Sequence, residues 1–242
     1  KNLRKHGAIG REWAAGYTIS LDRFSYDISK SVTAMGFPKA IGHEHEKAAI
    51  EQILSRQDVN NNVLLVGNPG AGRKRLIQDF ASRSALGENK SNLLNYKRVV
   101  ELDLSYLLAS IQNFEEAEAV VNETFQEAIQ AGNIILVLDE FHNFVGEGLE
   151  AAAGRINIAG ILTSFLRNPD FPLIAVTTYA GLHRYIEQNP SLLAFFEKVE
   201  VTELSGDESL AVLQEVVPSL ERLYKRFISY PALKSIVAFA DK

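Results

Sequence analysis

A glycine-rich segment, residues 67–74, has the spacing of a loop that binds phosphate. In that pattern, G-x-x-x-x-G-K-[ST], glycines let backbone N–H groups approach phosphate, a lysine reaches the β- and γ-phosphates, and a hydroxyl ligates Mg²⁺. Gly67 and Gly72 occupy the glycine positions, but Arg73 stands at the lysine position and Lys74 at the hydroxyl position. The segment therefore keeps the frame for nucleotide binding and departs from it at two chemically important positions.

An acidic pair further along the chain supplies a second half of such a site. The aliphatic run 134–138 predicts a strand buried on both faces, and Asp139 and Glu140 follow it directly. Carboxylates at the carboxyl end of a strand can hold Mg²⁺ and polarise an attacking water. A glycine turn and an unrelated surface acidic pair would supply the same residue types. The loop's place between a predicted strand and a predicted helix favours an anion site.

Short apolar runs alternate with helical periodicity through the middle of the chain. We expect strands at residues 63–66, 99–102, 134–138, 173–176 and 199–201, and helices at 44–55, after the loop, around 117–128 and around 158–166. This alternation predicts an α/β fold with a five-stranded parallel sheet between helices.

Three regions are expected along the chain. Residues 1–36 mix basic residues, aromatics and glycines, which predicts a lead-in arm; a solvated linker is favoured over a basic patch. Residues 37–204 would form the large α/β subdomain. Residues 205–242 would hold a linker helix and the start of a small helical lid. Ser205 and Glu208 have the spacing of a capping box that opens the linker helix, Pro218 should kink or end it, and Pro231 should start the next helix.

Composition excludes several classes of protein. The chain of 242 residues has 25 Lys and Arg against 30 Asp and Glu, a net charge of -5 that argues against a basic nucleic-acid-binding surface. It has no cysteine, which removes disulfides and thiolate metal sites and is compatible with a reducing compartment; we expect a cytoplasmic location. No apolar run approaches the ~20 residues that cross a bilayer. Because the sequence begins at Lys1, we expect a piece of a longer protein, and membrane contact outside it stays open.

Several separated segments resemble those of one known family. They are Leu21-Asp22-Arg23-Phe24, Ile41-Gly42-His43-Glu44-His45-Glu46, the loop 67–74, Leu138-Asp139-Glu140-Phe141-His142, and Thr177-Thr178 followed by Tyr185-Ile186-Glu187. With these segments the chain resembles the first ATPase module of the Clp-type AAA+ protein unfoldases and disaggregases. The resemblance implies the AAA+ P-loop NTPase fold, a hexameric ring of identical subunits, and ATP-driven threading of protein substrates.

The resemblance also implies a role for each matching residue. The phosphates of ATP or ADP would lie on the loop formed by Gly67, Asn68, Pro69, Gly70, Ala71, Gly72, Arg73 and Lys74. Ile41 would line the adenine pocket, and Thr178 would sense the γ-phosphate. Asp139 would coordinate Mg²⁺, and Glu140 would orient or deprotonate water.

The chain departs from the family pattern in the loop. Arg73 keeps the positive charge of the family's lysine, but its planar fork is not equivalent to a compact ammonium. Lys74 replaces a magnesium-ligating hydroxyl with a cation, which would repel Mg²⁺ and can pair with the phosphates instead. We therefore expect phosphate binding to survive better than metal-dependent hydrolysis.

Two more departures concern ring function. Ala194-Phe195-Phe196 stand where the family has the arginine fingers that reach a neighbouring subunit, and Arg184 is a possible substitute. The family's substrate-gripping pore loop has a basic-aromatic-glycine signature, whereas this chain has Ser110-Ile111-Gln112-Asn113-Phe114. Phe114 would either contact substrate or belong to the core.

Three functional hypotheses follow. An active ATPase module fits the intact Asp139 and Glu140, whereas a degenerate module that acts as a structural or interaction scaffold fits the altered loop and missing arginines. A DNA-acting AAA+ protein is disfavoured by the acidic balance. A zinc site at His43 and His45 is also disfavoured, because residues two apart do not share a helix face. We expect His142 to position the loop after the acidic pair, and we favour a chaperone module impaired in hydrolysis.

Overall fold

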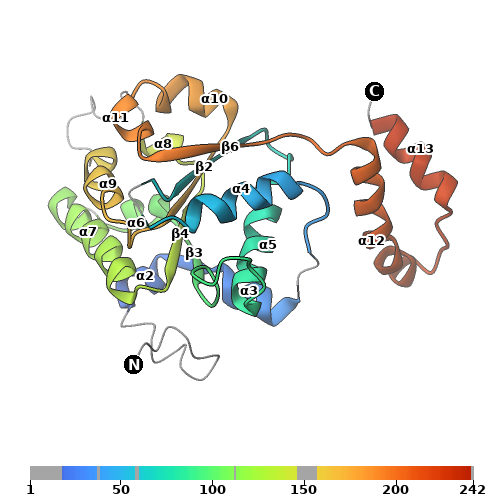
Figure 1. Ribbon diagram of the computed structural model, residues 1–242, viewed down its shortest axis with the longest axis horizontal. Coiled ribbons are helices and arrows are strands. Elements are labelled where there is room, and N and C mark those ends of the chain that lie inside the picture. The colour runs from blue at the N-terminus through green and yellow to red at the C-terminus, as the bar shows by residue number, and fades with distance from the viewer. Residues whose placement is uncertain (1–17, 37–38, 58–59, 112, 146–156, 241–242) are drawn as a thin grey trace.

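The computed structural model of the chain contains one six-stranded sheet (Figure 1). It describes residues 18–36, 39–57, 60–111, 113–145 and 157–240. The strands are β1 (Ser25–Asp27), β2 (Asn62–Gly67), β3 (Arg98–Leu102), β4 (Ile134–Leu138), β5 (Leu173–Thr177) and β6 (Phe196–Val201). They lie in the order β1-β3-β4-β5-β2-β6.

The predicted α/β fold is confirmed, and so are its five parallel strands, which are β2 to β6. The sheet as a whole is mixed, because β1 pairs antiparallel with β3 at one edge. Sequence reasoning missed β1 because its three residues are partly exposed or exposed and show no apolar alternation. Part of the segment expected as a lead-in arm thus belongs to the sheet.

Helices cover both faces of the sheet (Figure 1). They are α2 (Ile19–Arg23), α3 (Ile28–Met35), α4 (Glu44–Leu54), α5 (Arg73–Leu86), α6 (Leu104–Ser110), α7 (Phe114–Ala131), α8 (His142–Val145), α9 (Ile158–Leu166), α10 (Tyr179–Gly181), the π-helix η4 (Leu182–Ile186), α11 (Pro190–Leu193), α12 (Gly206–Tyr224) and α13 (Tyr230–Ala240).

The two faces of the sheet form two separate cores. One core joins the sheet to residues of α2, α7 and α9, and the other joins it to residues of α3, α4 and α5. In β4 the neighbours Leu136 and Val137 belong to opposite cores. This explains why β4 is apolar at every position, as the sequence predicted for a parallel strand buried on both faces.

The carboxyl-terminal helices α12 and α13 lie beside each other, away from the sheet (Figure 1). The capping box predicted at the start of α12 is present: Glu208 N–H donates to the Ser205 hydroxyl, and Ser205 N–H donates to the Glu208 carboxylate. Pro218 does not end the helix, which continues to Tyr224. Half-buried apolar residues lie on both sides of the proline, at Val217 and Leu220. No helix within the described ranges is both long and apolar enough to span a membrane.

Candidate functional site

The glycine-rich loop connects the carboxyl end of β2 to the first turn of α5. A side chain cannot be accommodated at Gly67, because a Cβ there would lie 2.7 Å from the carbonyl oxygen of Val201 on β6. Gly72 has a φ of 97°, a conformation that residues with side chains rarely adopt. Gly72 is also the N-cap of α5 and has no side chain to cap the helix. The N–H groups of the first turn are therefore suited to an anion.

The structure brings the loop and the acidic pair to the same edge of the sheet. β5 lies between β2 and β4, and all three strands are parallel. The loop follows β2, Asp139 and Glu140 follow β4, and Thr178 follows β5. The exposed tip of the loop is Asn68, Pro69 and Gly70, whereas Ala71 is buried.

Lys74 forms an ion pair with Asp139. Its Nζ atom lies 2.9 Å from Oδ2 of Asp139, whose other carboxylate oxygen accepts from the backbone N–H of Glu140. The hydrogen bond and the charge of Asp139 raise the pKa of Lys74. Burial raises the pKa of nearby Glu101 on β3, and the positive charge of Lys74 partly opposes that rise. The cation of the loop is thus held by the carboxylate expected to hold metal.

The loop does not offer Mg²⁺ the hydroxyl ligand of the usual pattern. The ion needs near-octahedral oxygen ligands, and at this site the expected hydroxyl is replaced by an ammonium that already neutralises Asp139.

Arg73 points at the sheet edge and is largely buried, with 11% of its side chain exposed. Its Nη1 donates to the carbonyl oxygen of Thr177 at 2.8 Å, and its Nη2 lies 4.0 Å from Oε1 of Glu140. The guanidinium is therefore engaged by the protein itself. Sequence reasoning named Thr177 only as part of the Thr177-Thr178 segment and missed its carbonyl as the partner of Arg73, because the two residues are distant in the sequence.

Glu140 lies between Arg73 and His142 and adopts a φ of 49°. On the side away from Arg73, its Oε2 is 3.5 Å from Nε2 of His142. Nδ1 of His142 is 3.1 Å from the Thr177 hydroxyl, and its ring stacks on Tyr185 with centroids 6.0 Å apart. His142 thus connects the acidic pair to the end of β5.

Thr178 has a capping role in the structure. Its hydroxyl accepts from the backbone N–H of Gly181 at 3.0 Å and so caps α10. The side chain is half-buried at the same sheet edge as Glu140. A phosphate-sensing role for Thr178 stays a prediction.

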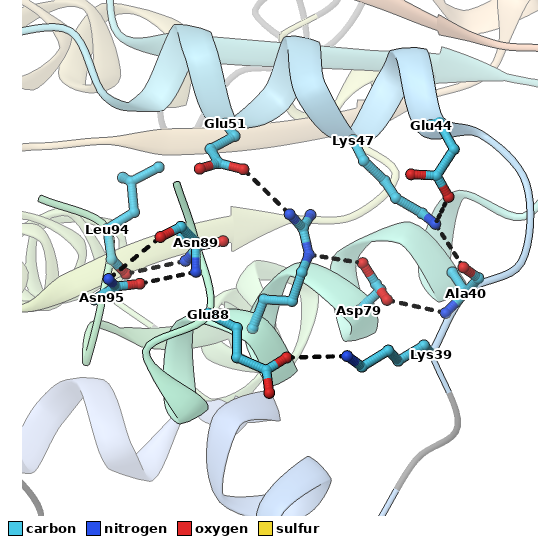
Figure 2. Close-up of polar contacts among 11 residues, drawn as sticks. Lys39, Ala40, Glu44, Lys47, Glu51, Asp79, Glu88, Asn89, Leu94 and Asn95 are labelled. Carbon is cyan, nitrogen blue, oxygen red and sulfur yellow. Dashed lines mark hydrogen bonds and ion pairs between the residues drawn. The ribbon is translucent and has the colours of Figure 1, made fainter. Parts of the chain in front are cut away.

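The segment that contains Ile41 is fixed by a buried polar network between α4 and α5, shown in Figure 2. The Ala40 N–H donates to Oδ1 of Asp79 at 2.9 Å, and Nζ of Lys47 donates to the Ala40 carbonyl. Nε of Arg83 donates to Oδ2 of Asp79 at 2.9 Å. Its Nη1 donates to Glu51 at 3.2 Å, which links α5 to α4. Half-buried Ile41 directly follows the anchored Ala40, and its role in an adenine pocket stays a prediction.

The positions expected for ring function carry other residues. Ala194 is exposed, Phe195 packs partly buried against the core, and Phe196 packs on Phe141 with centroids 5.5 Å apart. Arg184 is exposed, with its guanidinium 5.4 Å from the ring centroid of Tyr185. Of the expected pore loop, Gln112 and the Phe114 side chain lie outside the described residues.

Comparison with known proteins identifies the family to which the chain belongs. The chain matches the family model "ATPase family associated with various cellular activities (AAA)" over residues 63–201, which is more than half of its length. The chain therefore belongs to the AAA family.

Its relatives include the Clp chaperones. The chain is 33% identical over 241 residues to the chaperone protein ClpB of Helicobacter hepaticus, covering 100% of this chain and 28% of ClpB. It is 30% identical over 225 residues to the negative regulator of genetic competence ClpC/MecB of Bacillus subtilis, covering 93% of this chain and 27% of the relative. The chain thus spans less than a third of the length of these curated relatives.

The fold is similar to that of Hsp104. The S. cerevisiae Hsp104:casein complex in its extended conformation matches with a TM-score of 0.76 at 26% identity, over 92% of this chain and 37% of the Hsp104 chain. A closed-state reconstruction of Hsp104 with ATPγS and FITC casein matches with a TM-score of 0.78 at 25% identity, over the same shares of the two chains. The chain is an AAA+ module of the Clp and Hsp104 kind.

Proposed function

We propose that this module binds ATP or ADP weakly and without Mg²⁺, as part of a Clp-type chaperone that remodels proteins, and that it is impaired in hydrolysis. The observation that carries the proposal is the 2.9 Å ion pair between Lys74 and Asp139. The pair places a positive charge at the first turn of α5, where a metal-free phosphate group would be stabilised by the helix N-terminus and the ammonium together.

Impaired hydrolysis follows from what the site lacks. In related phosphoryl-transfer sites a metal ion bridges the β- and γ-phosphates, and an arginine finger contributes ~10³ to 10⁵ in rate. Here Lys74 engages the carboxylate of Asp139, and Ala194-Phe195-Phe196 provide no cation at the expected finger position. Glu140 keeps a carboxylate that can orient water. However, Arg73 faces its Oε1 atom and His142 faces its Oε2 atom, so both oxygens already have a neighbour in the protein.

Steady-state ATP turnover of the purified protein tests this proposal. We expect no turnover above that of the Glu140→Gln variant, with or without Mg²⁺. Glu187→Gln is a matched control, because Glu187 is an exposed carboxylate that pairs with His183. Mg²⁺-dependent turnover that Glu140→Gln abolishes and Glu187→Gln preserves would establish an active ATPase instead.

The second candidate function is a scaffold that does not bind nucleotide. It is favoured by Arg73, whose guanidinium donates to the Thr177 carbonyl at 2.8 Å and faces Glu140 rather than the loop. Calorimetric titration with ATP in EDTA separates the candidates: measurable heat with saturation supports nucleotide binding, and its absence supports the scaffold.

The assembly and the substrates are part of the same proposal. Similarity to the chaperone ClpB and to Hsp104 in complex with casein supports action on protein substrates. A ring of identical subunits is what the resemblance to the Clp family implies. A hexamer in the longer protein, a cytoplasmic location and the lack of a nucleic-acid partner remain predictions. Mass measurement of the longer protein with and without nucleotide tests the ring.

A further inference from the structure

His43 is a buried histidine with one ring nitrogen unpaired. It precedes α4, and 8% of the residue is exposed. Its Nδ1 lies 3.5 Å from Oε1 of Glu46, in the first turn of the same helix. Its Nε2 is buried and has no hydrogen-bond partner among the residues that the structure describes. Since buried polar atoms are nearly always paired, with protein, water or ligand, this ring nitrogen is available to a ligand.

The unpaired nitrogen faces the start of α5. A Cβ built on Gly72 would lie 3.2 Å from Nε2 of His43, and the missing side chain leaves that approach open. Gly72 is the N-cap of a 14-residue helix and provides no capping side chain. Two independent features, the helix N-terminus and the unpaired Nε2, therefore converge on one place.

The charged groups around His43 and the start of α5 indicate which kind of ligand the site would bind. The N-terminus of α5 favours an anion, and Lys74 in its first turn adds a cation that Asp139 partly neutralises. Two carboxylates, Glu46 and Glu208, interact with His43 itself. Glu46 stands at Nδ1, which leaves Nε2 as the ring nitrogen open to a ligand, and an Nε2–H group can donate to a phosphate oxygen.

We infer that His43 is a phosphate ligand of this site, with Nε2 donating to a phosphate of the nucleotide; this rests on the proposed nucleotide binding. The buried network around Ala40 in Figure 2 fixes the backbone three residues before His43 and so limits how far its ring can move. The role is one of binding: His43 adds a donor that the loop pattern itself does not contain.

Calorimetric titrations with inorganic tripolyphosphate and with ATP, both in EDTA, test the inference. The variant is His43→Asn, because Asn tolerates the observed φ of 55° and is too short to reach the site. The matched control is His45→Asn, which alters an exposed histidine two residues away. We expect His43→Asn to weaken both ligands about tenfold, as for loss of one charge-assisted hydrogen bond, and His45→Asn to change neither.

The outcomes separate the inference from the proposed function. Equal affinities of wild type and His43→Asn overturn the role of His43 while nucleotide binding stands. A loss for ATP but not for tripolyphosphate also overturns it, because the contact would then be with the nucleoside. If the wild type binds neither ligand, nucleotide binding itself fails. If His43→Asn does not fold, His43→Gly is the second variant, because glycine also adopts the observed φ of 55°: a loss of about tenfold for tripolyphosphate supports the inference, and no change overturns it.

Discussion

Nζ of Lys74 lies 2.9 Å from Oδ2 of Asp139, so the chain's own charges join the two halves of the candidate site. Lys74 lies in the first turn of α5, which the loop joins to β2, and Asp139 directly follows β4; β5 separates these two strands. Lys74 is 73% exposed, and such a pair contributes little to folding. We propose that the pair matters for binding instead, because Lys74 occupies the carboxylate oxygen of Asp139 that would otherwise bind a metal ion.

Restoring the usual loop residues should restore metal dependence. We expect the double variant Arg73→Lys with Lys74→Thr to bind ATP about tenfold more tightly in Mg²⁺ than the wild type does, since Asp139 is freed and a hydroxyl is supplied. Calorimetry measures the change. Arg75→Lys, one position further along α5, should leave ATP affinity unaltered. If the double variant binds as the wild type does, the defect lies elsewhere in the pocket.

The buried network in Figure 2 should contribute strongly to stability. Asp79→Asn removes the charge that Arg83 faces and weakens the bond to the Ala40 N–H, and we expect a loss of about 2 to 3 kcal/mol in the free energy of unfolding. Urea titration measures it. Lys39→Gln is the control, because the Lys39–Glu88 pair in the same view is exposed and should matter by less than about 0.5 kcal/mol. Similar losses in both variants would contradict the assigned role of the network.

Glu101 should make stability depend on pH. Burial raises the pKa of Glu101 above the ordinary 4.5, so the folded protein binds a proton more tightly than the unfolded chain does. Stability is therefore lost as the pH rises from 4.5 through the raised value. We expect Glu101→Gln to be more stable than the wild type at neutral pH, by less than about 1 kcal/mol because the side chain is partly exposed, and equal to it below 4.5. A variant less stable at neutral pH would contradict this assignment.

The two glycines of the loop should respond differently to alanine. At Gly67 a Cβ would meet the Val201 carbonyl oxygen at 2.7 Å, so Gly67→Ala should cost about 2 kcal/mol or more through displacement of β6. Gly70 has open space but a φ of 91°, so Gly70→Ala should cost only about 1 kcal/mol of backbone strain. Thermal unfolding compares them, and a larger loss at Gly70 would be the contrary result.

Local sequence patterns predicted the parts of the site that depend on residue type and spacing. Alternating apolar runs located β2 and β4, and glycine and acidic residues at their ends located the loop and Asp139. The short strand β1 was not predicted, because its pairing with β3, rather than its own apolar pattern, makes it a strand. The direction of Arg73 was also unpredictable, since it depends on the Thr177 carbonyl, a partner fixed only by tertiary folding.

The two histidines before and within α4 show the same limit. Their spacing argued against a shared metal, but it could not tell that His43 is buried beside Gly72 while His45 is exposed. The left-handed backbone at His43 and the close approach of the loop determine this difference. Neither is visible in the sequence around them.

The metal dependence of ATP binding tests the central claim most directly. Wild-type protein is titrated with ATP by calorimetry, once in EDTA and once with Mg²⁺ in excess. Because Lys74 already pairs with Asp139, we predict the same weak affinity in both conditions, within about twofold. Binding that is tight only in Mg²⁺ would contradict the account, since it would require the metal to displace Lys74 from Asp139.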